Sequence, residues 1–506
     1  MSLDLALNIA RSGLAAVQRG LAQNAQNVAN ADTAGYTRKA VAQESLVVAG
    51  GGPMGLRTAE ARRDVDAALA ARLDASRAAA AGAAAREDLL SGVEAAHGTA
   101  EGGGLADALA GLRDGLIALR ASPADAGKQT AAVEGARAVA GGLNRLSDAI
   151  GAARQRAQDG IVDEVAAANA ALREIAGLTL KIKTGGDGAL ASLEDRRDQA
   201  VARLSESLEV RAVRQPGGDL LLVARGGVAL PLDPDRDALG TAGAAVAPGA
   251  SFASGTLPGV TLNGIDVTAQ IGGGRLGEYV SLRDSTLPRY QAEADVLAAT
   301  VAGRLDAQGL RLFTDADGTV PDPALPYAGG AQVGFAGRMR LNAAVESNPA
   351  LLRDGTHAVP GSADGPTAFT PNPTGGPAGF TTLLDRVLAF GLGADAAAGV
   401  PWPAIRTGGL GPDGTLASPF AATPGLEAYA ARVAAAQTGD RAAATEARTQ
   451  AEGLRGALED KFGKRSGVDP DAEMAAMVGL QNAYAANARV LGTVQAMWDS
   501  LLSAVR

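Results

Sequence analysis

The 506-residue sequence contains no cysteine and only two histidines, and aromatic residues make up 3% of it. The missing cysteines exclude disulfide bonds, thiolate metal sites and cysteine nucleophiles. Two isolated histidines, His97 and His357, leave little material for a catalytic or metal site. The net charge of −9 argues against binding to the phosphate backbone of nucleic acids. The composition therefore favours a protein that assembles over one that catalyses a reaction.

A secretory signal and a membrane-spanning segment are not evident either. Residues 1–4 lack the basic start of a signal peptide. The longest charge-free run, residues 240–265, is rich in Gly, Thr, Pro and Ser, which is not the composition of a transmembrane helix. We therefore expect no membrane partner and no nucleic-acid partner. Export by a route that needs no signal peptide stays open.

Alanine and glycine are abundant, and apolar residues recur at alternating steps of four and three at both ends of the chain. This spacing is typical of the contact stripe of a coiled-coil helix, and it predicts helices within residues 1–34 and 474–506. The N-terminal stripe consists of Leu3, Leu7, Ala10, Leu14, Val17, Leu21, Asn24 and Val28. The C-terminal stripe consists of Met477, Leu480, Tyr484, Asn487, Leu491, Val494, Trp498, Leu501 and Val505.

The other faces of these two helices carry very little charge. Residues 1–31 contain three charged side chains, and residues 474–506 also contain three. A helix with one face in water normally carries charged residues on that face. Two interpretations stay open: the helices pair within the core of one molecule, or they become buried only among other subunits. We favour the second, because Ala and Gly faces bury too little apolar area to make an isolated pair firmly stable.

The interior alternates between helical and β-type patterns. Apolar spacing predicts one helix over residues 128–183 and another over 190–208, and helical spacing returns over 277–312. Glycine-containing turns between short β-branched runs predict hairpins at 216–218 and 263–264. The expected fold class is therefore mixed α and β and multidomain. Its core is a long α-helical coiled coil or bundle formed by the N- and C-terminal regions, with inserted β-rich domains.

Four domains follow from these patterns, and the last helical region is expected to break within residues 463–470 because of its glycines and proline. The expected domains are a terminal helical coiled-coil domain that forms an inner tube, 1–34 and 474–506; a helical bundle domain, 35–208, 276–312 and 424–473; a β-rich domain, 209–275; and an outer domain rich in β and loop structure, 313–423.

Motifs that could carry chemistry are each better explained as local structure. Residues 272–277 match the G-x-G-x-x-G pattern but lack the parallel βαβ unit of a dinucleotide fold, so we interpret them as a turn. Residues 315–318 lack the remaining ligands of a calcium loop and are also expected to form a turn. The charged run 195–198 is typical of a solvated helix face. We expect His97 to act as the charge partner of a helix end and His357 to be exposed. We therefore name no catalytic residue, no metal ligand and no cofactor.

One motif is more specific. Residues 29–38, Ala-Asn-Ala-Asp-Thr-Ala-Gly-Tyr-Thr-Arg, directly follow the N-terminal stripe. Asn30 and Thr33 can cap and turn the chain. Gly35 permits a positive φ, and Tyr36 offers a rigid amphipathic anchor for an adjoining surface. The segment resembles the signature shared by bacterial flagellar rod, hook and hook-associated proteins.

The C-terminal end and the interior extend this resemblance. Residues 481–491 resemble the terminal helix of the same proteins. Residues 193–199, 271–277, 283–288 and 466–468 look like the hook-associated protein 1 (FlgK) family. Two departures from the usual family pattern are Lys39, where Gln is frequent, and Asp469-Pro470-Asp471-Ala472, which replaces an Asn-Leu-Asp-Glu run.

The resemblance implies a structural axial protein of the bacterial flagellum, not an enzyme, which joins the hook to the filament and allows the filament to assemble. The implied partners are further copies of the chain in a ring or helical layer, the hook protein, the second hook-associated (junction) protein and a flagellar export chaperone. The implied location is the secreted flagellum, reached through the flagellar type III apparatus without a signal peptide. One alternative is another axial protein, such as the hook protein or the second junction protein. An enzyme built on a β insertion is a much weaker alternative.

The assembly interface that follows from the stripes and the resemblance lies at the two chain ends. Its predicted residues are Leu7, Leu14, Leu21, Asn24, Val28, Asn30, Thr33, Gly35, Tyr36, Tyr484, Asn487, Leu491, Trp498 and Leu501.

Overall fold

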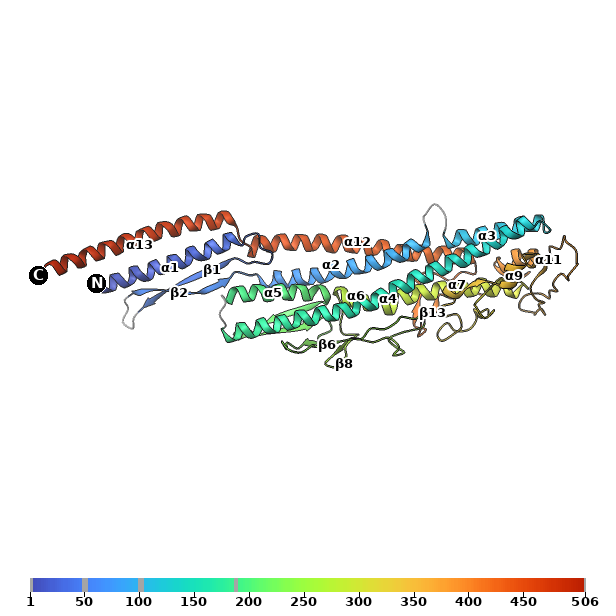
Figure 1. Ribbon diagram of the computed structural model, residues 1–506, viewed down its shortest axis with the longest axis horizontal. Helices are drawn as coiled ribbons and strands as arrows, with labels where there is room; N and C mark the ends of the chain where they lie inside the picture. The colour runs from blue at the N-terminus through green and yellow to red at the C-terminus, as the bar shows by residue number, and fades with distance from the viewer. Residues whose placement is uncertain (1–2, 48–52, 99–103, 186–189, 505–506) are drawn as a thin grey trace.

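The computed structural model describes residues 3–47, 53–98, 104–185 and 190–504, which form an elongated molecule (Figure 1). Long helices run side by side along its length, and both ends of the chain lie at the same end of the molecule. The chain therefore runs out through helices and returns through helices, as the sequence pattern predicts. No helix of the described residues has the length and hydropathy needed to cross a membrane.

Helices dominate the structure, and short strands connect them. The main helices are α1 (Leu3–Ala29), α2 (Ala67–Glu94), α3 (Leu105–Ala121), α4 (Ala126–Thr184), α5 (Leu190–Ser207), α6 (Gly274–Ser281), α7 (Leu287–Ala307), α12 (Leu426–Ser466) and α13 (Pro470–Ala504). The strands before α6 are β1 (Lys39–Val47), β2 (Pro53–Arg63), β3 (Val210–Arg214), β4 (Leu220–Ala224), β5 (Ala229–Leu230), β6 (Leu239–Gly240), β7 (Thr261–Leu262) and β8 (Ile265–Asp266).

The remaining elements are short and lie between α6 and α12. The helices are α8 (Phe335–Arg338), α9 (Ala343–Ser347), α10 (Leu351–Asp354) and α11 (Thr382–Arg386), with π-helical segments at Leu282–Thr286 and Val387–Gly391. The strands are β9 (Phe313–Thr314), β10 (Arg340–Leu341), β11 (Asp395–Ala397), β12 (Val400–Pro401), β13 (Gly408–Leu410) and β14 (Leu416–Ala417).

Helix α4 organises the helical domain, which also contains α2, α3, α5, α6, α7 and α12. It is 59 residues long, begins at an Asp125 cap that accepts two backbone amide hydrogen bonds, and ends at Gly185 in the left-handed conformation. Buried apolar residues recur along its length, from Ala132 to Ile182. The helices predicted over 128–183 and 190–208 are confirmed as α4 and α5.

The core of the helical domain is packed closely at small residues. A Cβ atom at Gly115 of α3 would lie 3.4 Å from the Cα of Ala132, and one at Gly135 of α4 would lie 3.3 Å from the Cα of Leu112. The two backbones therefore approach each other where side chains are smallest. This arrangement explains how a chain with few aromatic residues fills its interior.

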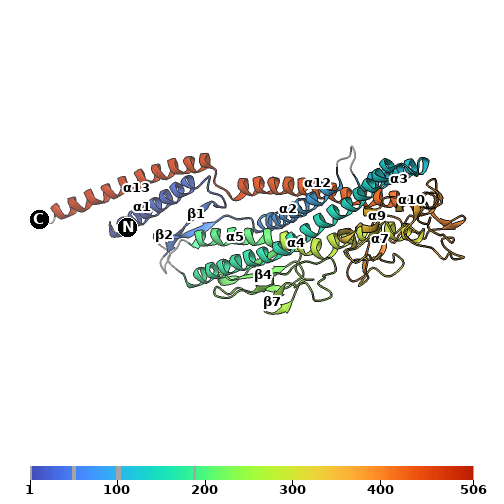
Figure 2. The ribbon, with the colours of Figure 1, turned by 45° about the vertical axis from the view of Figure 1, so that its right-hand side comes forward.

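A β-hairpin stands where the sequence analysis assigns residues to the helical bundle domain. Strands β1 and β2 pair antiparallel, with Lys39 opposite Arg63, and they pack against α1 (Figure 2). The expectation that residues 35–208 belong to a helical bundle is therefore corrected for residues 39–47 and 53–63. A two-stranded ribbon is marginally stable alone and depends on the surface beneath it, which no local sequence pattern reports.

Two three-stranded antiparallel sheets follow α5, in the orders β3-β4-β5 and β6-β7-β8. Asn263 (φ 49°) and Gly264 (φ 83°) form the tight turn between β7 and β8, as predicted. Gly273 (φ 72°) and Gly274 (φ 62°) turn the chain into α6, and a Cβ at Gly274 would lie 2.6 Å from the backbone of Ser207. The turn that we expected over residues 272–277 is therefore confined to Gly272 and Gly273, because residues 274–277 form the first turn of α6.

The buried carboxylate of Asp295 in α7 binds part of the irregular outer region. Asp295 accepts hydrogen bonds from the amides of Gly334 and Ala336 and from the hydroxyl of Tyr327, at 2.7–2.8 Å. Burial raises the pKa of Asp295 to about 6, although these hydrogen bonds favour the carboxylate. An acidic residue within the predicted helical stripe thus has a structural function.

The two motifs predicted in the outer loops are both local structure. Asp315 accepts hydrogen bonds from the amides of Asp317 and Thr319, so residues 315–318 form the predicted turn. His357 lies in a loop but is half-buried near Asp306, which corrects the expectation that it is exposed.

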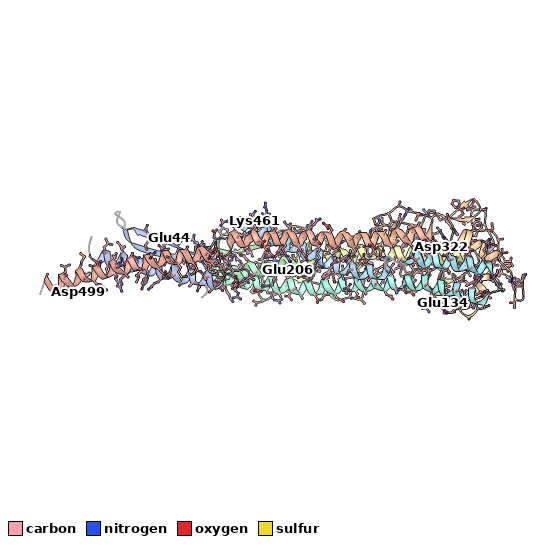
Figure 3. The ribbon with its side chains drawn as sticks, turned by 90° about the horizontal axis from the view of Figure 1, so that it is seen from above. Glu44, Glu134, Glu206, Asp322, Lys461 and Asp499 are labelled. Carbon is pink, nitrogen blue, oxygen red and sulfur yellow. The ribbon has the colours of Figure 1, made fainter. Side chains whose placement is uncertain are left out.

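Helices α12 and α13 follow one another along the length of the molecule: Lys461 lies in α12, and Asp499 lies in α13 near one end of the molecule (Figure 3). The predicted break within residues 463–470 is confirmed, because α12 ends at Ser466 and α13 begins at Pro470. This break separates the helical domain from a terminal pair, which we define as α1 and α13.

Candidate assembly interface

The two helices of the terminal pair lie side by side and antiparallel (Figures 1 and 2). Two glycines of α1, seven residues apart, mark the line of contact. A Cβ at Gly13 would lie 3.1 Å from Oδ1 of Asn487, and one at Gly20 would lie 3.2 Å from Cδ1 of Leu480. Pairing within one molecule, the interpretation that we did not favour from the sequence, is therefore what the structure shows. Burial among other subunits stays a prediction for the faces that this pairing leaves open.

The predicted leucine stripe of α1 is not its most buried face. Leu7, Leu14, Leu21 and Val28 are half-buried, as is Asn24. The buried residues of α1 are Ala10, Gly13, Ala16, Val17 and Asn27. The separation of packed helices depends on the side chains at their contact, and the small residues allow α13 to approach closely. The leucines therefore lie at the edge of the pair and keep part of their apolar surface in solvent.

Helix α13 is far more open than α4. Of its 35 residues only Glu473 and Val494 are buried. The predicted interface residues on it are half-buried (Asn487, Leu491 and Trp498) or exposed (Tyr484 and Leu501). Further exposed apolar residues, which the stripe does not include, are Met474, Val478, Val490, Met497 and Leu502. The signal that could have found them is the lack of charge on every face of the helix.

The hairpin β1–β2 covers a second side of α1. The hydroxyl of Ser12 accepts a hydrogen bond from the amide of Leu56 at 3.1 Å, and the side chain of Arg19 donates to the hydroxyl of Thr58. Residues 42–45 of β1 are exposed on the outside of this ribbon. The terminal pair therefore exposes the half-buried leucines of α1 and the outer faces of α13, and the hairpin beside it exposes strand β1.

The signature turn after α1 has the local structure that its residues predict. The side chain of Asn30 donates to the carbonyl of Gln26 at 2.8 Å and accepts from the hydroxyl of Thr33 at 3.4 Å. Gly35 has a φ of 74°, and a Cβ there would lie 2.6 Å from the side chain of Gln199. The turn thus needs glycine both for its conformation and for its close approach to α5.

Tyr36 is held inside the molecule by a residue that sequence reasoning missed. Its hydroxyl donates to Oδ1 of the buried Asn27 at 2.9 Å, and its ring lies 3.8 Å from Nζ of Lys39. The side-chain amide of Asn27 also donates to the carbonyl of Lys39 and to the carboxylate of Glu473. Burial raises the pKa of the Tyr36 hydroxyl, with a smaller contribution from the charge of Asp195. Tyr36 is therefore an anchor between α1, β1 and α13, and its contact with other subunits stays a prediction.

Asp195 joins the hairpin to the helical domain. It is 4% exposed and accepts from the hydroxyl of Thr37 at 2.5 Å, with Nζ of Lys39 and Nη1 of Arg63 each at 3.0 Å. The neighbouring Arg197 is also buried. The prediction that residues 195–198 form a solvated face is therefore wrong, because a hairpin distant in sequence covers this face and supplies its counter-charges. Removing one partner of such a pair leaves a buried charge, at a cost of about 3–5 kcal/mol.

Both departures from the usual family pattern have local partners. Lys39 forms the buried ion pair with Asp195. Asp469 caps α13 by accepting hydrogen bonds from the amides of Asp471 and Ala472 at 3.0 and 3.2 Å. These residues therefore stabilise the junction between the terminal pair and the helical domain.

The histidine at the end of the first helical segment has a different environment from the one expected. Nε2 of His97 lies 2.7 Å from Oε1 of Gln437, and burial lowers the pKa of the imidazole. His97 ends its helical segment as expected, but it is half-buried there, hydrogen-bonds to α12, and is held toward the neutral form by burial. Among the described residues, no cluster of three or more His, Cys, Asp or Glu side chains could hold a metal ion.

Comparison with known proteins agrees with this architecture. Residues 90–320 match the flagellar hook-associated protein FlgK helical domain, and residues 461–504 match the C-terminal domain of the flagellar basal body rod FlgEFG proteins. The solved structure of the flagellar hook junction protein FlgK from Burkholderia pseudomallei is similar, with 22% sequence identity and a TM-score of 0.42. That match covers 50% of this chain and 46% of the other, so the chain spans about half the length of that protein. No curated protein matches the sequence.

A helical domain of the FlgK type, followed by a terminal helix of the rod and hook type, defines an axial protein of the bacterial flagellum. Within that class, the match of residues 90–320 to the FlgK helical domain supports the resemblance to the FlgK family of hook-associated proteins that the residues at the two ends and in the interior predict.

Proposed function

We propose that this chain is a structural adaptor at the hook–filament junction, where it joins the hook to the filament and allows the filament to assemble. One observation carries the proposal: the core of the helical domain is closed, whereas the apolar and nearly uncharged surface of α13 is uncovered in the single chain. Contiguous apolar surface of this kind marks a site of contact with other protein.

The arrangement of the molecule supports a layered assembly. The terminal pair extends beyond the helical domain at one end (Figure 1), and the two three-stranded sheets lie against the helical domain rather than the terminal pair. The terminal pair forms the inner tube with further copies, the helical domain forms the next layer, and the β modules face outward. Apolar contacts are non-directional, so contacts with the hook protein on one side tolerate sliding, while the other side receives the second hook-associated protein.

Export through the flagellar type III apparatus accounts for two features of the sequence. The chain has no cysteine, so no disulfide has to form after it unfolds and refolds during passage. The apolar faces of the terminal pair would be exposed before assembly, and an export chaperone would bind and shield them.

Removal of residues 474–506 tests the proposal. Glu473 stays in place in this truncated chain, and so do its contacts with Arg38 and Asn27. We expect the truncated chain to be soluble and helical by circular dichroism, yet absent from hook tips in antibody-labelled images and unable to support filaments. Assembly of this chain on hooks would contradict the proposal. Labelling of the full-length protein along the whole hook would instead indicate the hook protein's function.

A further inference from the structure

A groove with a volume of about 910 Å³ lies in the helical domain beside the signature turn. Its walls are the first part of α2, the middle of α5, and the strands β3 and β4, and Gly35 and Thr37 line one end. No contact in the mechanism proposed above uses this groove.

The groove is basic, although the whole chain is acidic. Six arginines and three carboxylates line it, whereas the chain as a whole has a net charge of −9. The arginines are Arg63, Arg72, Arg77, Arg211, Arg214 and Arg225. Four of them pair with carboxylates, but Arg72 and Arg211 have no ion pair within the described ranges of the chain. Two exposed cations therefore stand at the groove without a partner.

Strands β3 and β4 line the groove, and one face of their sheet is uncovered beside it. Val213 and Leu221 are opposite each other in the register and are 37% and 36% exposed, while the alternate residues Leu220 and Leu222 are buried against the helical domain. An apolar sheet face next to unpaired arginines suits a partner segment that combines apolar residues with carboxylates.

The chain itself contains such a segment at the opposite edge of the same sheet. The loop 231–237, Pro-Leu-Asp-Pro-Asp-Arg-Asp, follows β5 and carries three aspartates and one arginine. Asp237 pairs with Arg173 of α4, and the side chain of Asn169 binds the backbone of the two residues that follow the loop. The loop is therefore held in place with Asp235 and Asp237 exposed and Asp233 half-buried, and prolines restrict its backbone.

We infer that the basic groove of one copy receives the acidic loop 231–237 of a neighbouring copy. Because groove and loop lie toward the β3 and β5 edges of one sheet, the contact joins two different surfaces of identical subunits. A contact of this kind repeats around a ring or along a helical layer. The inference rests on the proposed function and adds a lateral contact of the helical domain to it.

Cross-linking tests the contact directly, because the chain has no cysteine of its own. Ala71 is exposed on the α2 wall of the groove, and Asp235 is exposed in the loop. Copies with Ala71→Cys and copies with Asp235→Cys are produced together, and isolated flagella are treated with a short bismaleimide. We expect covalent dimers from the mixture and none from either variant alone. Ala71→Cys with Asp317→Cys, in the outer region, is the matched control and should give no dimers.

Charge reversal provides a second measurement. Arg72→Glu with Arg211→Glu should lower the amount of chain incorporated into flagella about tenfold, because like charges then face each other. Asp233→Arg with Asp235→Arg in the same chain should restore it. Arg196→Glu, an exposed residue of α5 outside the groove, is the control and should have no effect.

The outcomes separate this inference from the proposed function. If the chain stands at the junction but no dimers form, or if reversal of the loop fails to restore incorporation, the lateral contact is wrong and the proposed function stands. If the full-length chain is absent from the junction, the proposed function itself fails.

Discussion

The helical domain and the terminal pair are built from the same kind of Ala-rich amphipathic helix, but only the helical domain is complete in one chain. Helix α4 buries apolar residues along 59 residues, whereas the 35-residue α13 buries only two residues. The difference lies in what surrounds each helix: α4 contacts helices on several sides, and α13 contacts mainly α1. The open and nearly uncharged faces of α13 are therefore the places where the proposed assembly would supply the missing neighbours.

The comparison predicts that equal truncations will have unequal effects in the two regions. Ile150 of α4 is fully buried, so Ile150→Ala should lower the free energy of unfolding by about 2–5 kcal/mol through lost burial and a cavity. Met497 of α13 is 52% exposed, and Met497→Ala should change the free energy of unfolding by less than about 0.5 kcal/mol. Urea denaturation of the soluble chain measures both. Equal losses would show that α13 is as well buried as α4 in solution.

The helical domain should also respond to pH in a way that the charge-poor terminal pair does not. Burial raises the pKa of Asp74 in α2 from 3.8 to about 6, against the nearby charge of Arg77. Because the raised pKa favours the neutral acid in the folded state, this contribution is fully present below pH 4 and is lost as the pH rises through 6. The stability of the natural chain relative to Asp74→Asn should therefore fall by about 3 kcal/mol over that range.

Denaturation of both chains at several pH values measures this difference. Asp107→Asn, at an exposed position of α3, provides the matched background because it also removes one carboxylate. A difference between the natural chain and Asp74→Asn that does not change with pH would contradict the effect of burial.

Local patterns predict the helices well, because each long helix carries its own apolar period and its own ends. The helix expected over 128–183 is α4, at Ala126–Thr184, since Asp125 and Gly185 supply the end signals. The turn at 263–264 and the entry into α6 at Gly273 and Gly274 are equally local, because they depend on glycine or asparagine at positive φ. The flagellar resemblance rested on similar continuous segments.

What the sequence did not reveal depends on contacts between distant segments. Asp195 looks solvated on its own helix, and only the hairpin bearing Lys39 and Arg63 makes it buried. Likewise, the leucine stripe of α1 suggests a contact face, yet Gly13 and Gly20 bring α13 to a different side. A period of apolar residues shows that a helix has a contact face, but the closest approach is set by the smallest side chains of both partners.

Overpacking of the glycine line should loosen the terminal pair without affecting the helical domain. Even the first side-chain atom, a Cβ at Gly20, would lie 3.2 Å from Cδ1 of Leu480. Gly20→Val should therefore destabilise the pairing of α1 and α13 by about 1–3 kcal/mol. Hydrogen exchange should then become faster in α1 and α13 and stay unchanged in α4. Gly479→Ala is the matched control, because a Cβ there meets no atom within 4 Å and only raises helix propensity. Unchanged exchange in Gly20→Val would mean that the helices do not pair in solution.

Substitutions on the outer faces of α13 should have the smallest effect on the stability of the free chain, but a large effect on its assembly. Val478 and Leu502 are 56% and 60% exposed on the outer faces of α13, so Val478→Ser with Leu502→Ser should alter the free energy of unfolding by less than about 0.5 kcal/mol per site. In the assembled organelle the same residues are proposed to be buried, and each serine there would lose apolar contact and place a hydroxyl in an apolar environment. We therefore expect a normally folded monomer that fails to accumulate at hook tips, whereas Ser503→Ala on the same exposed helix end has no effect. Normal accumulation of the double variant would show that these faces stay in solvent after assembly, and the contrast between the two regions would then have another cause.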